Sequence, residues 1–141
     1  MSSLKAEFTE EGLVTDSETN TNRVVPEGSP VPFAPELTAT AGLQYELQMG
    51  SWSLTPRVQV SYLDEQLSTP FRYAATTVPS RTVADVRLTA MPTESLRLEA
   101  FATNVFDETY IAAQVQNASS ATGGIIYGAP RQIGVRVRFD F

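Results

Sequence analysis

Strict alternation of apolar and polar residues constrains this chain more than any other feature. In the last stretch, PRQIGVRVRFDF, every second residue from Ile133 to Phe141 is apolar, and the residues between them are polar or glycine. Successive side chains of a strand point to opposite faces, so this period of two predicts a β-strand with one apolar and one charged face. Strand ends usually fray, so alternation that persists to a final aromatic residue indicates a pairing partner and an apolar environment.

The same period recurs upstream and predicts an all-β chain. Strands are expected at residues 37–48, 52–63, 82–91, 96–106 and 132–141, and residues 3–9 resemble the end of a further strand. Helical spacing of apolar residues is absent from these segments, which are rich in β-branched and aromatic residues. The sequence therefore predicts an antiparallel meander of about six strands.

The connections between these strands alternate between short and long. Residues 49–51 and 92–95 predict tight turns, whereas residues 10–36, 64–80 and 107–131 are long, lack periodicity and are expected to be irregular loops. Several such loops argue against a compact soluble domain. Strands of about 9 to 11 residues, with short turns on one side and long loops on the other, are typical of a transmembrane β-barrel.

Aromatic and charged residues agree with a barrel. Two aromatic belts are expected, one near the short turns and one near the long loops: Tyr45, Trp52, Phe139 and Phe141, and then Tyr62, Phe106 and Tyr110. The charged residues of the strands all fall on the polar face, which we expect to line the lumen: Arg57, Asp85, Arg87, Arg97, Glu99, Arg136, Arg138 and Asp140. One lysine against nine arginines favours a structured polar interior, where guanidinium groups pair with carboxylates.

Composition narrows the function classes. The chain has 141 residues, a formal net charge of -6, and no Cys or His. Nucleic-acid binding needs a clustered basic excess, so it is not expected. Lack of His and Cys removes the commonest metal ligands and most nucleophile and base pairs, so we expect no catalytic residues, no metal and no cofactor. The N-terminal MSSLKAEFTEEG does not resemble a secretory signal, and no run approaches the ~20 apolar residues of a spanning helix.

Three short motifs resemble those of a known family. They are Phe33-Ala34-Pro35-Glu36-Leu37 leading into Gly42-Leu43-Gln44-Tyr45, then Asn104-Val105-Phe106-Asp107-Glu108-Thr109-Tyr110, and Tyr127-Gly128-Ala129-Pro130-Arg131 before the last strand. Together with the final Phe141, they resemble the C-terminal part of the barrel of TonB-dependent outer-membrane receptors. The resemblance covers roughly residues 30 to 141.

The resemblance implies a function in transport. Receptors of this family are plugged barrels of about 22 strands. They import scarce, bulky nutrients, most often ferric siderophores, with energy from an inner-membrane TonB complex that pulls on the plug. The resemblance also implies a position in the bacterial outer membrane, contact with its lipid, and recognition of Phe139 and Phe141 by the outer-membrane assembly machinery. Because only about six strands and no plug are recognisable, residues 1–141 are expected to be the C-terminal segment of a longer receptor.

Candidate ligand contacts lie in the last long connection. They are Tyr110, Gln114, Gln116, Asn117 and Tyr127, chosen because binding residues concentrate in loops. Asn104 and Asp107 stand where a strand becomes a loop, and a structural role in capping that corner is favoured over ligand contact. Two alternatives to the transport receptor stay open: a soluble all-β binding module, and another outer-membrane barrel that acts as an enzyme or adhesin.

Overall fold

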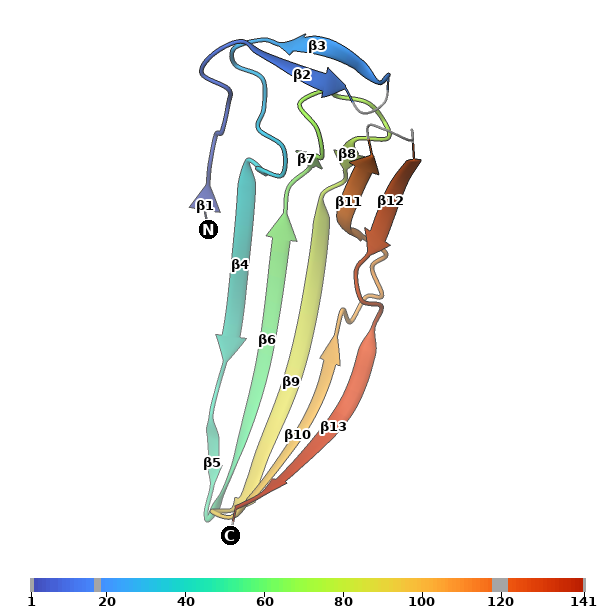
Figure 1. Ribbon diagram of the computed structural model, residues 1–141. Helices are drawn as coiled ribbons and strands as arrows, with labels where there is room; N and C mark the ends of the chain where they lie inside the picture. Colours follow the sequence, from blue (N-terminus) through green and yellow to red (C-terminus); the bar gives the residue numbers. More distant parts are fainter. Residues whose placement is uncertain (1, 17–18, 118–121, 141) are drawn as a thin grey trace. The chain divides into compact units, whose positions relative to one another are not determined.

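The computed structural model describes residues 2–16, 19–117 and 122–140, which form strands, turns and connecting segments (Figure 1). Across these ranges there is no α-helix, and hence no helix long and apolar enough to cross a membrane. The all-β prediction is confirmed. Its basis is the alternation of β-branched, aromatic and polar residues, which fits the two faces of a pleated strand.

One antiparallel sheet contains the long strands. Its order is β1 (Ser2–Ser3), β4 (Leu37–Gln44), β6 (Trp52–Leu63), β9 (Arg81–Thr93), β10 (Leu96–Thr103) and β13 (Gln132–Phe139), and the short β5 (Leu47–Met49) also pairs with β6. Consecutive long strands lie side by side (Figure 1), so the predicted meander is confirmed. Gly50 has a positive φ of 68° in the two-residue turn between β5 and β6, a conformation that glycine adopts without steric cost.

Several strand boundaries differ from the predictions. The predicted strand 37–48 is interrupted between Gln44 and Leu47. β9 continues to Thr93, so the turn before β10 is shorter than the predicted 92–95. β10 ends at Thr103 and not at residue 106, because Asn104 has a positive φ of 50° that a strand does not accommodate.

The predicted strand at residues 3–9 is wrong over most of its length. Ser2 and Ser3 pair with Thr38 and Leu37 of β4, after which the chain leaves the sheet. Further along, Glu7 forms an isolated bridge with Pro30. The backbone of this segment is thus engaged by the first long connection rather than by a neighbouring strand.

The sequence suggested that the three long connections are irregular loops, and this prediction is wrong. Each contains a two-stranded hairpin: β2 (Gly12–Asp16) with β3 (Thr21–Val25), β7 (Gln66–Leu67) with β8 (Thr77–Val78), and β11 (Ile111–Asn117) with β12 (Thr122–Tyr127). Apolar residues such as Leu13 and Val24 remain exposed on the first hairpin. Apolar residues follow one another directly in several of these strands, as in Leu13-Val14 of β2 and Ile125-Ile126 of β12, so a period of two is absent and the pattern did not reveal them.

The chain divides into two compact units, which we call the sheet unit and the loop unit. The sheet unit comprises Thr40–Ser61, Thr82–Glu108 and Ala129–Phe141, and the loop unit comprises Met1–Ala39, Tyr62–Arg81 and Thr109–Gly128. Most buried apolar side chains of the described residues belong to the loop unit: Val25, Leu67, Phe71 and Val78. Ala84 is their counterpart in the sheet unit. The long strands are therefore not built around a core of their own.

Candidate functional site

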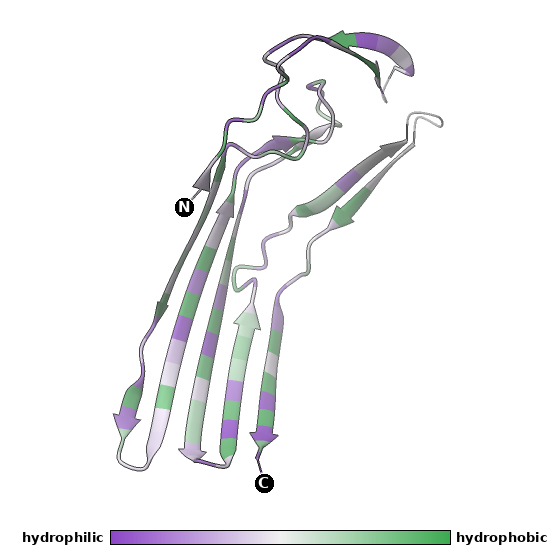
Figure 2. Cartoon of the chain, turned by 60° about the vertical axis from the view of Figure 1, so that its left-hand side comes forward, coloured by the Kyte–Doolittle hydropathy of each residue, from purple (hydrophilic) through white to green (hydrophobic). Residues whose placement is uncertain are grey.

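The two faces of the main sheet differ sharply in polarity. Apolar and polar residues alternate along β6, β9, β10 and β13, as the green and purple bands in Figure 2 show. Because the strands pair in register, residues of one kind form continuous rows across the sheet. The apolar rows are Ala90, Leu98 and Val137; Leu88, Ala100 and Val135; and Val86, Ala102 and Ile133.

The apolar face is largely exposed. Ile133 and Val135 expose 77% and 75% of their surface, and Val137 and Phe139 on the same strand are also exposed. Exposed apolar side chains continue onto the neighbouring strands: Leu43, Val58, Val60, Val86 and Leu88. A contiguous apolar face of this extent is unusual in a soluble monomer and marks a surface that meets another apolar phase.

The polar face collects the charged residues that the sequence assigned to a lumen. In the register of β10 and β13, Arg97 lies opposite Arg138 and Glu99 lies opposite Arg136. On the side toward β6, a hollow of about 200 Å³ is lined by Arg57, Gln59, Asp85, Arg87, Phe101 and Thr103. Seven of the eight predicted residues therefore share one face of the sheet, opposite the apolar rows, and the eighth, Asp140, follows the end of β13.

Glu99 connects two arginines across three strands. Its carboxylate lies 3.0 Å from Nη1 of Arg136 on β13 and 3.7 Å from Nη1 of Arg87 on β9. The Glu99 side chain is only 12% exposed, whereas both arginines are half-exposed or more. An ion pair whose arginine is largely exposed to water contributes modestly to stability, on the order of 1 kcal/mol.

Asn104 organises the corner after β10. Its side-chain Oδ1 accepts the backbone N–H of Glu108 at 2.9 Å, and its Nδ2 donates to the carbonyls of Glu108 at 2.9 Å and Ala129 at 3.1 Å. Its backbone N–H donates to Asp85 Oδ1 on β9 at 2.9 Å. Asn104 is 3% exposed, so the hydrogen bonds of this buried amide are used within the corner, in agreement with the predicted capping role.

Asp107 completes the same corner. Its Oδ1 accepts the backbone N–H of Arg131 at 2.9 Å, at the point where the chain enters β13. Like Asn104, Asp107 has a positive φ, here 55°. Asn and Asp adopt this left-handed conformation more readily than other non-glycine residues, which explains the use of an Asx residue at both positions. Between them, Phe106 is exposed.

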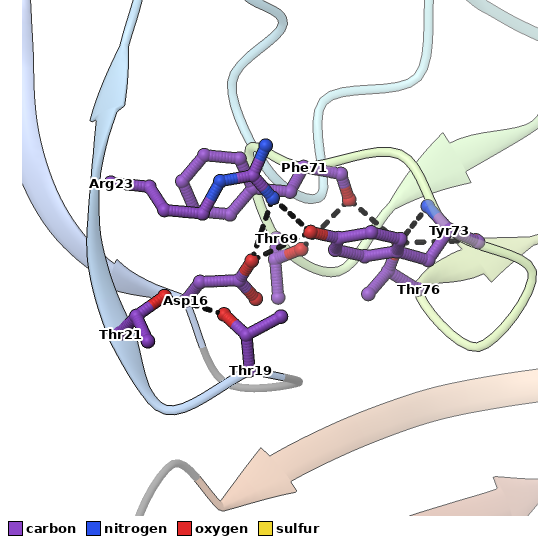
Figure 3. A network of polar contacts seen from close by, with 8 residues as sticks. All are labelled: Asp16, Thr19, Thr21, Arg23, Thr69, Phe71, Tyr73 and Thr76. Carbon is purple, nitrogen blue, oxygen red and sulfur yellow. Dashed lines mark hydrogen bonds and ion pairs between the residues drawn. The ribbon is translucent and has the colours of Figure 1, made fainter.

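The loop unit contains a polar network that the sequence did not reveal (Figure 3). Asp16 at the end of β2 is almost fully buried and accepts hydrogen bonds from Arg23 Nη1 at 2.8 Å and from the Tyr73 hydroxyl at 2.6 Å. The Arg23 guanidinium also contacts the Tyr73 hydroxyl and lies 4.7 Å from the centre of the Phe71 ring. Hydrogen bonding to Asp16 raises the pKa of Arg23 above its ordinary value.

Thr76 shapes the segment that carries the two aromatic residues. Its hydroxyl donates to the Phe71 carbonyl at 2.7 Å and accepts the Tyr73 backbone N–H at 2.9 Å. Thr76 is fully buried. These bonds fix the turn between β7 and β8, so that Phe71 and Tyr73 face Arg23 of the first hairpin (Figure 3). Contacts across 50 residues of sequence leave no local signal, which is why this network was missed.

The structure gives Tyr110 and Gln114 contacts inside the loop unit. The Arg81 guanidinium lies 4.7 Å from the Tyr110 ring centre and donates to the Ile111 carbonyl at 2.8 Å, and the ring also packs on Gly128. Gln114 is buried, and its Nε2 donates to the Ala75 carbonyl. Its Oε1 has no hydrogen-bond partner within the described part of the chain.

The other candidate residues are distributed differently. Tyr127 is exposed at the end of β12. Gln116 and Asn117 belong to β11, and their side chains lie outside the described residues. Phe139 ends β13, while Phe141 also lies outside the described residues. Ligand contact by any of the five loop residues therefore stays a prediction. Within the described ranges, no cluster of Asp or Glu side chains is arranged to hold a metal ion.

Comparison with known proteins adds one relation. No protein-family model and no curated protein matches the sequence. Among solved structures, the crystal structure of the ferric yersiniabactin uptake receptor FyuA from Yersinia pestis matches 86% of this chain, with a TM-score of 0.73 and 20% sequence identity. The chain has the fold of part of that receptor. The match spans 18% of the length of FyuA, so most of FyuA has no counterpart in this chain.

Proposed function

We propose that this chain forms barrel strands at the C-terminal end of a TonB-dependent outer-membrane receptor, which takes up a bulky nutrient, a ferric siderophore by class. The observation that supports this most strongly is the division of the sheet into an exposed apolar face and an ionic face. Lipid covers an apolar face of this kind, and the opposite face lines a wet interior. The structural likeness to FyuA, whose name describes ferric yersiniabactin uptake, supports the class of cargo.

The alternative of a soluble binding module fits less well. In a soluble antiparallel sheet the apolar face is buried against a second layer and the polar face meets water. Here many side chains of the apolar face are exposed, and those of β13, such as Ile133 and Val135, are exposed at 77% and 75%. A barrel with enzyme or adhesin activity would share the apolar face, and nothing in the described part of the chain favours it over a receptor.

The proposal includes neighbours for both edges of the sheet. β1 and β13 stand at the two ends of the strand order, so each has one edge without a partner among the described strands. Unpaired backbone N–H and C=O groups in lipid cost several kcal/mol each, so a membrane sheet has to close. The remaining barrel strands would pair with these edges. The charged residues of the polar face would face a plug domain, through which the inner-membrane TonB complex acts.

Two further parts of the proposal concern named residues. Phe139 and Phe141 serve as the signal for the outer-membrane assembly machinery, because Phe139 ends an exposed apolar strand face and Phe141 continues the same alternation in the sequence. Tyr110, Gln114, Gln116, Asn117 and Tyr127 contribute to nutrient contact from the last long connection. Among those with described side chains, Tyr127 is the strongest candidate, because the residue is 61% exposed and therefore available to a ligand.

Uptake of iron by intact cells tests the proposal. Cells that carry the gene with its natural upstream sequence are compared with cells that lack it, each supplied with radio-iron chelates of several siderophore classes. We expect gene-dependent accumulation that is abolished by a protonmotive-force uncoupler, and recovery of the protein in the outer-membrane fraction. Recovery of the protein in the aqueous fraction, or identical uptake in both strains for every chelate, would contradict it.

A further inference from the structure

We infer that two contacts, the corner formed by Asn104 and Asp107 and the fit of Phe101 on Gly134, fix the register of β13 on β10. We call these two contacts the register lock. They are needed because the residue pattern of β13 is compatible with a second register, displaced by two residues. The inference concerns strand pairing and holds whether or not the chain is part of a receptor.

The apolar pattern does not distinguish the two registers. In the structure Leu98 lies opposite Val137, and Ala102 lies opposite Ile133. Displacement by two residues would place Leu98 opposite Phe139 and Ala102 opposite Val135, so every apolar side chain would keep its face. Displacement in the other direction would bring Arg131 onto the apolar face and is therefore disfavoured.

The charge pattern favours the displaced register. In the structure Arg97 lies directly opposite Arg138, a like-charge pair that destabilises a sheet. After displacement Arg97 would face Asp140, and Glu99 would face Arg138 in place of Arg136. Opposite charges would then meet at both positions. Neither hydrophobicity nor charge accounts for the observed register, so other contacts have to select it.

The first selecting contact is steric. The Phe101 ring lies over Gly134, its directly opposed residue, so closely that a Cβ on Gly134 would be 2.5 Å from the ring Cζ. Gly134 thus provides the space that the ring occupies. In the displaced register Phe101 would face Arg136, and the ring would lose its position on the backbone.

The second selecting contact is the corner itself. Asn104 Nδ2 donates to the Ala129 carbonyl at 3.1 Å, and Asp107 Oδ1 accepts from the Arg131 N–H at 2.9 Å, so the corner binds the backbone that enters β13 at two points. Asn104 is itself fixed to β9 by its hydrogen bond to Asp85. A two-residue displacement would move the incoming backbone by about 7 Å. Both hydrogen bonds would be lost.

Disulfide trapping in the full chain tests the register lock, because the chain contains no Cys. Leu98→Cys with Val137→Cys reports the observed register, and Leu98→Cys with Phe139→Cys reports the displaced one. Directly opposed residues are close enough for a disulfide, whereas diagonal neighbours at about 7–8 Å are too far apart. Each pair is introduced separately into the otherwise unchanged chain and oxidised in detergent micelles. We expect the first pair to form a disulfide in most molecules and the second pair in few.

The variant Phe101→Ala/Asn104→Gly/Asp107→Gly removes the three side chains of the lock, and glycine retains the positive φ of the corner. We expect the ratio of observed to displaced product to fall about tenfold or more. The matched control Thr103→Ala/Phe106→Ala/Glu108→Ala alters the same segment but keeps the lock, and its ratio should equal that of the original chain. An unchanged ratio in the first variant would overturn the inference.

A second comparison decides the matter if the triple variant loses its sheet. Gly134→Ala alone should lower the ratio about threefold, because the added methyl group collides with the Phe101 ring. Phe101→Ala should lower the ratio as well, because the ring that fits on Gly134 is gone, and adding Gly134→Ala to Phe101→Ala should lower it no further, since no ring remains to collide with the methyl group. A ratio that does not change in Gly134→Ala, or that falls equally when Gly134→Ala is added to Phe101→Ala, would contradict the steric half of the lock.

Discussion

Asn104 shows how one side chain can combine a backbone conformation with several hydrogen bonds. It adopts a left-handed φ and bonds Glu108 and Ala129 through its amide. Asn104→Ala should therefore lower the free energy of unfolding by about 2–4 kcal/mol, from the lost hydrogen bonds and the strain of alanine at positive φ. Urea unfolding in micelles measures this.

The matched control for Asn104 is Glu108→Ala. Glu108 takes part in the corner through its backbone, and its side chain is exposed, so truncation should change stability by no more than about 0.5 kcal/mol. A loss as large as that of Asn104→Ala would show that the corner is generally fragile and that the amide is not its basis.

Arg23 in the loop unit has a far more buried ion-pair partner than Arg72. It pairs with the nearly buried Asp16 and stacks on Phe71, whereas Arg72 pairs with the exposed Glu65. Arg23→Ala should increase hydrogen exchange across residues 67–78, and Arg72→Ala should increase it much less, because the partner of Arg72 is exposed. Equal effects of the two substitutions would mean that the Asp16 network does not hold the loop unit together.

At the scale of elements, alternation explains which strands could be predicted. β6 begins and ends at Trp52 and Leu63 as expected, because one of its faces is apolar throughout. The hairpins β2–β3 and β11–β12 were missed, since neighbouring residues in their strands are both apolar, as in Val24-Val25 and Ile125-Ile126, and the period of two is lost. The network of Asp16, Arg23 and Tyr73 was missed because it joins distant segments. Asn104 could be anticipated, since an Asx residue at a strand end is a local signal.

β9 provides a direct comparison of the two faces of one strand. Leu88 belongs to the apolar rows, while its neighbour Thr89 belongs to the polar face and is followed across the sheet by Glu99. Leu88→Arg should destabilise the assembled protein by about 2–4 kcal/mol if this face meets lipid. Thr89→Arg introduces the same charge beside Glu99 and should be tolerated.

The outcome is read from the amount of folded protein in the outer membrane. Leu88→Arg should reduce it severely, and Thr89→Arg should leave it near the original level. Equal levels for the two variants would contradict a lipid-facing role for the apolar rows.

At the scale of the whole molecule, the central claim is that the apolar face of the long strands contacts lipid. The claim rests on exposed rows that contain no charge, together with a fold shared with part of a receptor. It predicts that the proximity of side chains to the lipid acyl chains varies with a period of two residues along each strand.

Quenching by brominated lipids measures this proximity most directly. Single Cys residues at positions 86, 87, 88 and 89 are labelled with a fluorophore in the protein reconstituted, with its natural neighbouring strands, in vesicles of brominated lipid. We expect strong quenching at Val86→Cys and Leu88→Cys and weak quenching at Arg87→Cys and Thr89→Cys. Uniform quenching along the four positions, or stronger quenching at 87 and 89, would contradict the claim.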